Sequence, residues 1–226
     1  SLSGNYVSGL ALDGQQRLWV LTPQGLNLYQ AETNDFKRFS LRATGHHRSV
    51  KSPWKLKSDH RGRLWISSGG GLSLFDPDSH REVSLPLDEA MLPIDDFIFS
   101  PDHRFWVMSQ QQLYEWHEEK QQLQPVPFPL QAQDQLISLT LAPNVAATQL
   151  WLASSQGLYR YDVSQQTTRF YAKQDLGITA KLTDLEFDPQ GQLWMGTQAG
   201  LYVWELDSPR GQFIHHHIHN SVVPLA

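Results

Sequence analysis

Three histidines near the end of this chain have a spacing that could support metal chemistry. His215, His217 and His219 alternate in the run His-His-His-Ile-His, and on a strand their imidazoles would share one face, which suits a zinc ion. The run lies at the polar end of the last of several repeated units, where surface residues are expected. We therefore predict a solvent-exposed strand here and no metal site.

Acid–base and nucleophilic chemistry have little support. Asp95 and Asp96 could be drawn as paired carboxylates, but neighbours on a regular strand point to opposite faces. The chain has no cysteine, no Gly-x-Ser-x-Gly elbow and no His-Glu-x-x-His segment. Gly69, Gly70 and Gly71 lack the following lysine and helix of a phosphate-binding loop, so they indicate a turn. We predict no catalytic residue and no cofactor.

A repeated phrase defines the elements that must position these side chains. It consists of Leu-Trp or Phe-Trp in an apolar run, a small hydroxyl residue, a short loop and, in four of its five copies, Gly-Leu; the third copy has Gln112 in place of the glycine. Successive copies are 46, 41, 45 and 43 residues apart, measured between Trp19, Trp65, Trp106, Trp151 and Trp194. A period in the low forties with strand-like alternation and Asp, Pro and Gly turns is typical of four-stranded propeller blades.

We therefore predict an all-β fold, a β-propeller of four-stranded antiparallel blades. A single propeller region spans 1–226, and its blades are expected at about 5–40, 50–85, 94–128, 136–171 and 182–217. Residues 218–226 repeat the pattern of the chain's start and are expected to open a sixth blade, so the chain is predicted to be part of a larger propeller.

The phrase and its flanks, clearest in residues 5–29 and 182–202, resemble the two-component regulator propeller repeat. That repeat reads roughly Asn-x-Val-x-x-Leu, Asp-x-x-Gly, Leu-Trp-Val-Gly-Thr and Gly-Leu, and the resemblance covers essentially the whole chain. It implies the periplasmic sensor region of an inner-membrane receptor, with an oligosaccharide ligand and an output domain such as a histidine kinase or diguanylate cyclase. The family offers no invariant catalytic residues, so the site must be argued from geometry.

In a propeller the first strands line the central channel, and the loops between second and third strands open on one of its faces. The polar and aromatic residues at these places are the candidate ligand-binding residues: Tyr6, Trp54, Lys55, Asp95, Asp96, Asp184, Gln111, Gln156 and Gln198. Trp54 could stack on a sugar ring or could pack between blades. Lys55 or Lys57 could contact a ligand or could pair with Asp96 or Asp184 across the channel. Both alternatives stay open at this stage.

The predicted function is ligand sensing without catalysis, for an oligosaccharide or another small molecule. A propeller lyase and a protein-binding scaffold are the alternatives. The net charge of −5 and the lack of a basic face argue against nucleic acid as a partner. Open blade edges would favour self-association, and membrane contact is expected only through segments outside this chain.

Overall fold

The computed structural model describes residues 1–41, 54–68, 71–85, 87, 93–117, 119–120, 122–143, 148–206 and 212–214. The regular elements within these residues are all β-strands, and no helix among them is long and apolar enough to cross a membrane. The predicted opening of a sixth blade at 218–226 lies outside the described residues.

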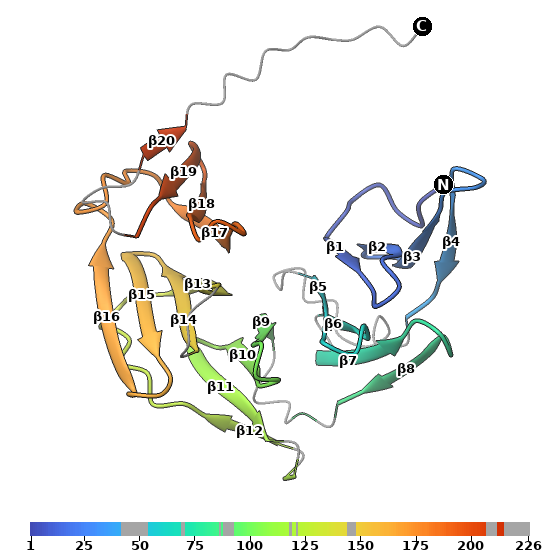
Figure 1. Ribbon diagram of the computed structural model, residues 1–226, viewed down its shortest axis with the longest axis horizontal. Helices are drawn as coiled ribbons and strands as arrows, with labels where there is room; N and C mark the ends of the chain where they lie inside the picture. The colour runs from blue at the N-terminus through green and yellow to red at the C-terminus, as the bar shows by residue number, and fades with distance from the viewer. Residues whose placement is uncertain are drawn as a thin grey trace, which may run out of the picture. The chain divides into compact units, whose positions relative to one another are not determined.

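The described strands form five four-stranded sheets, and each sheet is a meander of consecutive antiparallel strands (Figure 1). Blade 1 contains β1 (Gly9–Leu12), β2 (Leu18–Thr22), β3 (Gly25–Gln30) and β4 (Asp35–Phe39). Blade 2 contains β5 (Lys55–Ser58), β6 (Leu64–Ser68), β7 (Gly71–Asp76) and β8 (Arg81–Ser84). Blade 3 contains β9 (Ile94–Phe99), β10 (Phe105–Ser109), β11 (Gln112–His117) and β12 (Gln122–Pro125).

The remaining two sheets follow the same order. Blade 4 contains β13 (Leu136–Leu141), β14 (Gln149–Ser154), β15 (Gly157–Asp162) and β16 (Thr167–Ala172). Blade 5 contains β17 (Leu182–Phe187), β18 (Leu193–Thr197), β19 (Gly200–Trp204) and β20 (Gln212–Ile214). The all-β propeller predicted from the sequence is thereby confirmed, with every copy of the repeated phrase spanning a second strand, a tight loop and the start of a third strand.

The phrase forms this hairpin because each of its residue types has a local role. Side chains of the Leu-Trp run point alternately to the two faces of the sheet, and both faces are buried. Four of the five residues of β2 are therefore buried. The hydroxyl of Thr22 donates to the carbonyl of Gly25 and closes the loop. Gly25 has a φ of 144°, and a Cβ there would lie 2.4 Å from the carbonyl oxygen of Phe39, so the neighbouring fourth strand requires glycine.

In three of the blades, an aspartate in the turn between first and second strands accepts a hydrogen bond from the repeated tryptophan of the same blade. One carboxylate oxygen of Asp59 accepts from the backbone N–H groups of Arg61 and Arg63, and the other accepts from the Arg63 guanidinium. The same second oxygen accepts from the indole N–H of Trp65. The equivalent indole bonds measure 2.7 Å for Trp19 to Asp13, 2.9 Å for Trp65 to Asp59 and 2.9 Å for Trp194 to Asp188. We call this arrangement the Asp–Trp hook.

Blades 3 and 4 lack the hook. Ser100 and Ala142 occupy the position of the aspartate. In each blade the backbone N–H at this position donates a hydrogen bond to the carbonyl of the residue two places before the tryptophan, and Ser100 and Ala142 make this bond as the aspartates do. The indole N–H groups of Trp106 and Trp151 have no hydrogen-bond partner among the described residues, although both side chains are about 1% exposed. The repeated tryptophan is therefore retained for its packing even where its polar atom has no acceptor.

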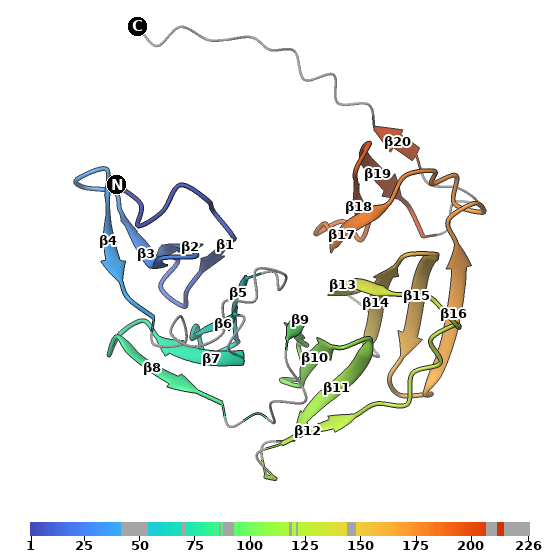
Figure 2. The ribbon, with the colours of Figure 1, turned by 180° about the vertical axis from the view of Figure 1, so that it is seen from behind.

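The chain divides into two compact units, Ser1–Leu130 with blades 1 to 3 and Gln131–Ala226 with blades 4 and 5. Within each unit neighbouring blades pack face to face, with β1 beside β5 and β13 beside β17 (Figures 1 and 2). Aromatic side chains fill these interfaces. Trp19 and Phe39 meet Phe75 between blades 1 and 2.

Blades 4 and 5 use the same device, because Trp151 and Tyr171 meet Trp204 there. The second unit also holds its first segment in place through a buried phenol. Tyr159 donates to Asp134 at 2.8 Å and accepts from the backbone N–H of Gln131 at 3.1 Å. Burial, together with the bond to this carboxylate, raises the pKa of Tyr159 to about 12.

Candidate functional site

The pairing register identifies equivalent positions on the five first strands. Each lies opposite the second residue after the repeated tryptophan, and the five residues are Gly9, Lys55, Asp96, Ser138 and Asp184. Three of them are predicted ligand-binding residues. The repeat thus offers one backbone position per blade and varies its side chain, which is how a propeller acquires a specific site on a uniform scaffold.

Within the first unit this position forms a charged group. The carboxylate of Asp96 is 1% exposed and lies 3.4 Å from the ammonium nitrogen of Lys55 and 3.2 Å from that of Lys57. Lys57 also lies over the ring of Phe97, with its nitrogen 5.8 Å from the ring centroid. We call Lys55, Lys57 and Asp96 the charged triad.

The triad shows that the lysines pair with Asp96, as one of the two alternatives from the sequence anticipated. The lysine side chains are 22% and 27% exposed, so both remain partly accessible from solvent. Each ammonium has three donors and can hold Asp96 while donating to a ligand oxygen. Pairing and ligand binding are therefore compatible at this site.

Asp95 behaves differently from Asp96 because β9 is not regular at this point. Asp96 pairs with Met108 and Ile94 with Ser109, which leaves Asp95 as the extra residue of a β-bulge. Its carboxylate accepts from the backbone N–H of Gln110 at 3.0 Å. Burial raises the pKa of Asp95, and the nearby charge of Asp96 adds to this effect. The regular alternation assumed from the sequence does not hold here, and Asp96 lies near enough to contribute to the raised pKa of Asp95.

The second unit has a simpler polar contact at the equivalent position. Asp184 accepts from the hydroxyl of Ser138 at 2.5 Å and from the backbone N–H of Leu185 at 3.1 Å. It joins the first strands of blades 4 and 5. Register shifts beside Ser138 and Asp184 place bulges at the same level as in β9. Bulges are known to re-aim side chains next to functional sites.

The candidate glutamines lie in the loops between second and third strands, as expected. Gln111 follows Gln110 in the β10–β11 loop, and both have positive φ angles, 66° and 47°. This pair suits a two-residue hairpin, and it explains how blade 3 turns without the glycine of the other copies. Gln156 and Gln198 occupy the corresponding loops of blades 4 and 5, where both side chains are exposed.

The two aromatic candidates have different surroundings. Tyr6 is 72% exposed and therefore accessible to a ligand. Trp54 is partly buried against the apolar cluster between blades 1 and 2, which includes Leu56 and Ile66. Trp54 thus has the packing contacts that the sequence offered as one of its two alternatives, and its stacking on a sugar stays a prediction.

The histidine run cannot be placed. His215, His217 and His219 lie outside the described residues. Within the described part of the chain, no group of three or more His, Cys, Asp or Glu side chains could hold a metal ion.

The sequence left two polar features unspecified. It gave Lys55 and Lys57 as alternative partners of Asp96, and the structure pairs both of them with this carboxylate. The aspartate of the Asp–Trp hook was interpreted only as a turn residue. Its spacing of six residues before the tryptophan in three copies is the signal that could have revealed the hook.

The fold and this geometry define a β-propeller protein with a polar first-strand site. No family model matches the sequence, and no curated protein matches it. Solved propellers do match the structure. The extracellular domain of the hybrid two-component system BT3049 from B. thetaiotaomicron superposes with a TM-score of 0.70 at 15% identity, over 93% of this chain and 30% of that one.

Two further solved structures are also similar to this chain. The extracellular domain of the hybrid two-component system BT4673 from B. thetaiotaomicron gives a TM-score of 0.68 at 16% identity, over 92% of this chain and 28% of that one. A catalytically inactive variant of virginiamycin B lyase from Staphylococcus aureus, with quinupristin, gives 0.68 at 14% identity, over 96% and 72%. The chain thus spans less than a third of the length of the two extracellular domains. At these identities the likeness establishes the propeller fold.

Proposed function

We propose that this chain is the ligand-sensing part of a membrane-bound receptor, located in the periplasm and without catalytic activity of its own. The observation that carries the proposal is the charged triad, in which a buried carboxylate on β9 pairs with two partly exposed lysine side chains on β5. The likeness to extracellular domains of two-component systems supports the same function. Signal output by a kinase or cyclase domain elsewhere in the protein is part of the proposal.

The proposed ligand is an oligosaccharide. Lysine ammonium groups and carboxylates donate to and accept from sugar hydroxyls, and the exposed ring of Tyr6 offers an apolar face for stacking. Gln111 adds an amide in the β10–β11 loop of the same unit. Asp184, Gln156 and Gln198 are the equivalent candidates in the second unit.

A glycan-binding screen by thermal shift tests this proposal, because a ligand that binds only the folded state raises the melting temperature. A hit is then titrated calorimetrically against the wild type and Lys57→Met, which removes the charge and keeps most of the side chain. We expect affinity to fall about tenfold, as for loss of one charge-assisted hydrogen bond. Lys37→Met on β4 is the control and should bind normally. Binding that is equal in all three proteins would contradict a site at the triad.

A lyase is the second candidate, favoured by the likeness to virginiamycin B lyase. Incubation with quinupristin, followed by chromatography, tests it directly. Consumption of quinupristin by the purified chain, lost in Asp96→Asn, would establish an enzyme and overturn the non-catalytic proposal. Unchanged quinupristin would count against the lyase.

A further inference from the structure

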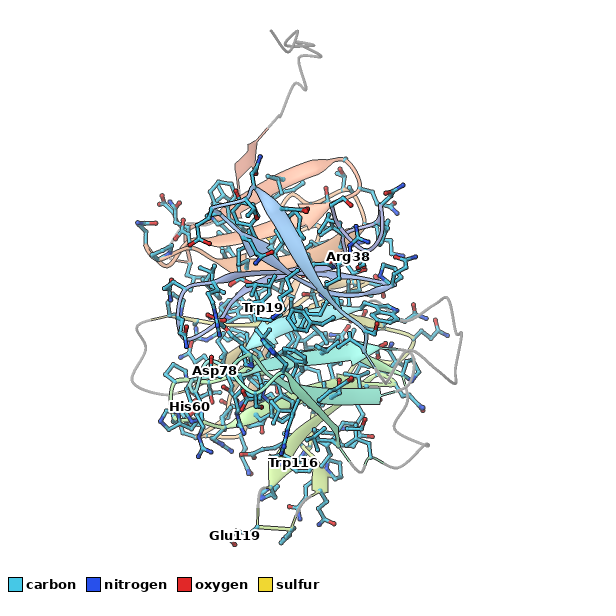
Figure 3. The ribbon with its side chains drawn as sticks, turned by 90° about the vertical axis from the view of Figure 1, so that its right-hand side faces the viewer. Trp19, Arg38, His60, Asp78, Trp116 and Glu119 are labelled. Atoms are coloured by element: carbon cyan, nitrogen blue, oxygen red, sulfur yellow. The ribbon has the colours of Figure 1, made fainter. Side chains whose placement is uncertain are left out.

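The interface between blades 2 and 3 contains a cavity of about 230 Å³ that is separate from the charged triad. Its floor is aromatic and comes from both blades, with Trp65 on β6, Phe99 on β9, Phe105 on β10 and Trp116 on β11. The rings of Trp65 and Phe105 are 4.7 Å apart, and those of Phe99 and Phe105 are stacked at 4.5 Å. Figure 3 labels Trp116 and His60, two of the residues that line the cavity.

Blades 1 and 4 have an aromatic residue at a position of the fourth strand where blade 2 has a leucine. The position is the fourth-strand residue opposite the leucine of Gly-Leu. It is Phe39 in blade 1, opposite Leu26, and Tyr171 in blade 4, opposite Leu158. In blade 2 the equivalent residue is Leu85, whose backbone N–H donates to the carbonyl of Leu72. Phe39 packs 5.6 Å from Phe75 of the next blade, and Tyr171 packs 5.1 Å from Trp204. Trp116 is the residue of blade 3 that corresponds to these two partners.

Leu85 therefore stands where the other two interfaces have a ring. A leucine is shorter and lacks the flat face that would cover Trp65 and Trp116, so the space remains open. The cavity is larger than the cavities of roughly 150 Å³ that accept benzene in protein cores. Its volume is thus sufficient for an aromatic ring.

The lining of the cavity includes charged residues, and among them Arg61 is exposed. Asp59 is the anionic residue there, and it is neutralised by Arg63 at 2.8 Å. Arg61 also lines the mouth, and its guanidinium has no ion pair or hydrogen bond to any described residue. The rings of His60 and His103 lie beside it, 3.9 Å apart. A free guanidinium is suited to a carboxylate, which it can hold through two parallel bonds.

We propose that this cavity binds a small aromatic carboxylic acid. The ring of the ligand takes the position that Phe39 and Tyr171 fill in the other interfaces, and its carboxylate pairs with Arg61. The residues of the charged triad do not line this cavity, so it serves a ligand different from the one proposed at the triad.

Phenylacetate is the probe that tests this proposal, with calorimetry and the indole N–H signals of Trp65 and Trp116 as readouts. Hexanoate, which lacks the ring, and benzyl alcohol, which lacks the carboxylate, should both bind at least about fivefold more weakly. Arg61→Ala should weaken the binding of phenylacetate by about tenfold and leave the binding of benzyl alcohol unchanged. Arg81→Ala, an exposed arginine on β8 of the same blade, is the matched control and should bind normally.

Leu85→Phe supplies the missing ring from the protein itself. We expect this variant to lose phenylacetate binding and to melt at a higher temperature than the wild type. Binding of hexanoate as tight as that of phenylacetate would overturn the proposal, as would unchanged phenylacetate binding in Arg61→Ala. Arg61 is exposed, so its variant keeps the test decisive even if Leu85→Phe folds poorly.

Discussion

Asp59 accepts hydrogen bonds from the indole of Trp65, from the guanidinium of Arg63 and from N–H groups of its own turn. Burial acts to raise its pKa, but these bonds outweigh burial and hold the pKa below its ordinary value. The sequence predicted the turn correctly from Asp and Gly. The hook itself was not predicted, because the carboxylate and the indole are six residues apart in the sequence and meet only once the hairpin has formed.

At this scale we predict that Asp59→Ala lowers the free energy of unfolding by about 1–3 kcal/mol. The change leaves the buried N–H of Trp65 without an acceptor and frees the Arg63 guanidinium. Urea denaturation followed by tryptophan fluorescence measures the loss. Glu32→Ala, at an exposed site in blade 1, is the control and should change stability by less than about 0.5 kcal/mol. A loss no larger than that of the control would show that the hook contributes nothing.

At the scale of elements, the first turn has a fixed shape in four blades. The third residue after the hook position has a positive φ angle in each: Gln16 (61°), Gly62 (72°), His103 (67°) and Gly191 (86°). Glycine is thus not required by the turn itself. Gly62 has a second reason to be glycine, because a Cβ there would lie 2.4 Å from the backbone of Gly14 in the adjacent turn of blade 1.

Gly62→Ala and Gly191→Ala form a matched pair for this close approach. A Cβ at Gly191 has open space, so Gly191→Ala should cost only about 1 kcal/mol for the left-handed backbone. Gly62→Ala carries the same backbone cost and must also push blades 1 and 2 apart, so we expect a loss at least about 1 kcal/mol larger. Chemical denaturation of both variants gives the comparison. Equal losses of stability in the two variants would mean that the turns containing Gly14 and Gly62 can move apart without a cost in free energy.

Features local to one hairpin were predictable from the sequence, and features that depend on contacts between strands or blades were not. The Trp and Gly-Leu positions predicted each second and third strand, because their roles are local to one hairpin. Residues that act between blades were not predictable in the same way. The bulge at Asp95 depends on how β9 meets β10, and the cavity at Leu85 depends on what blade 3 brings opposite it. Of the predicted site residues, Lys55 and Asp96 form an ion pair, which was one of the two alternatives predicted from the sequence.

At the scale of the whole molecule, the two units carry different titrating groups. The raised pKa of Tyr159 means that its bonds to Asp134 and Gln131 are made by the neutral phenol. A raised folded-state pKa contributes stability that is fully present below the ordinary value of 10.0 and is lost as the pH rises through about 12. The contribution belongs to the second unit alone.

We predict that alkaline destabilisation between about pH 10 and pH 12 depends on this phenol. Tyr159→Phe should be less stable at neutral pH, because Asp134 loses a donor, and its stability should fall less steeply over the alkaline range. Urea midpoints measured at several pH values test this. Tyr29→Phe, at the surface of blade 1, should keep the wild-type slope. A wild-type slope in Tyr159→Phe would contradict the assignment.

Association between molecules also belongs to this scale. Tyr6, Val7, Leu10 and Leu12 are exposed by 72%, 45%, 59% and 46%, and all lie in or just before β1. We propose that this apolar group promotes self-association, since apolar patches of this kind mark contact surfaces. The double change of Leu10 and Leu12 to serine should lower the weight-average mass in light scattering at high concentration. Val83→Ser, which removes an exposed apolar side chain from β8, should have no such effect. A monomeric wild type would contradict the proposal.

The uneven distribution of the Asp–Trp hook gives the repeats separate spectroscopic signatures. A carboxylate acceptor moves an indole proton downfield in a magnetic resonance spectrum, so Trp19, Trp65 and Trp194 should resonate apart from Trp106 and Trp151. Each of these five tryptophans belongs to a different blade. They therefore form two natural groups of probes, blades 1, 2 and 5 with the hook and blades 3 and 4 without it, and the response of each group to ligand, acid or denaturant can be followed separately.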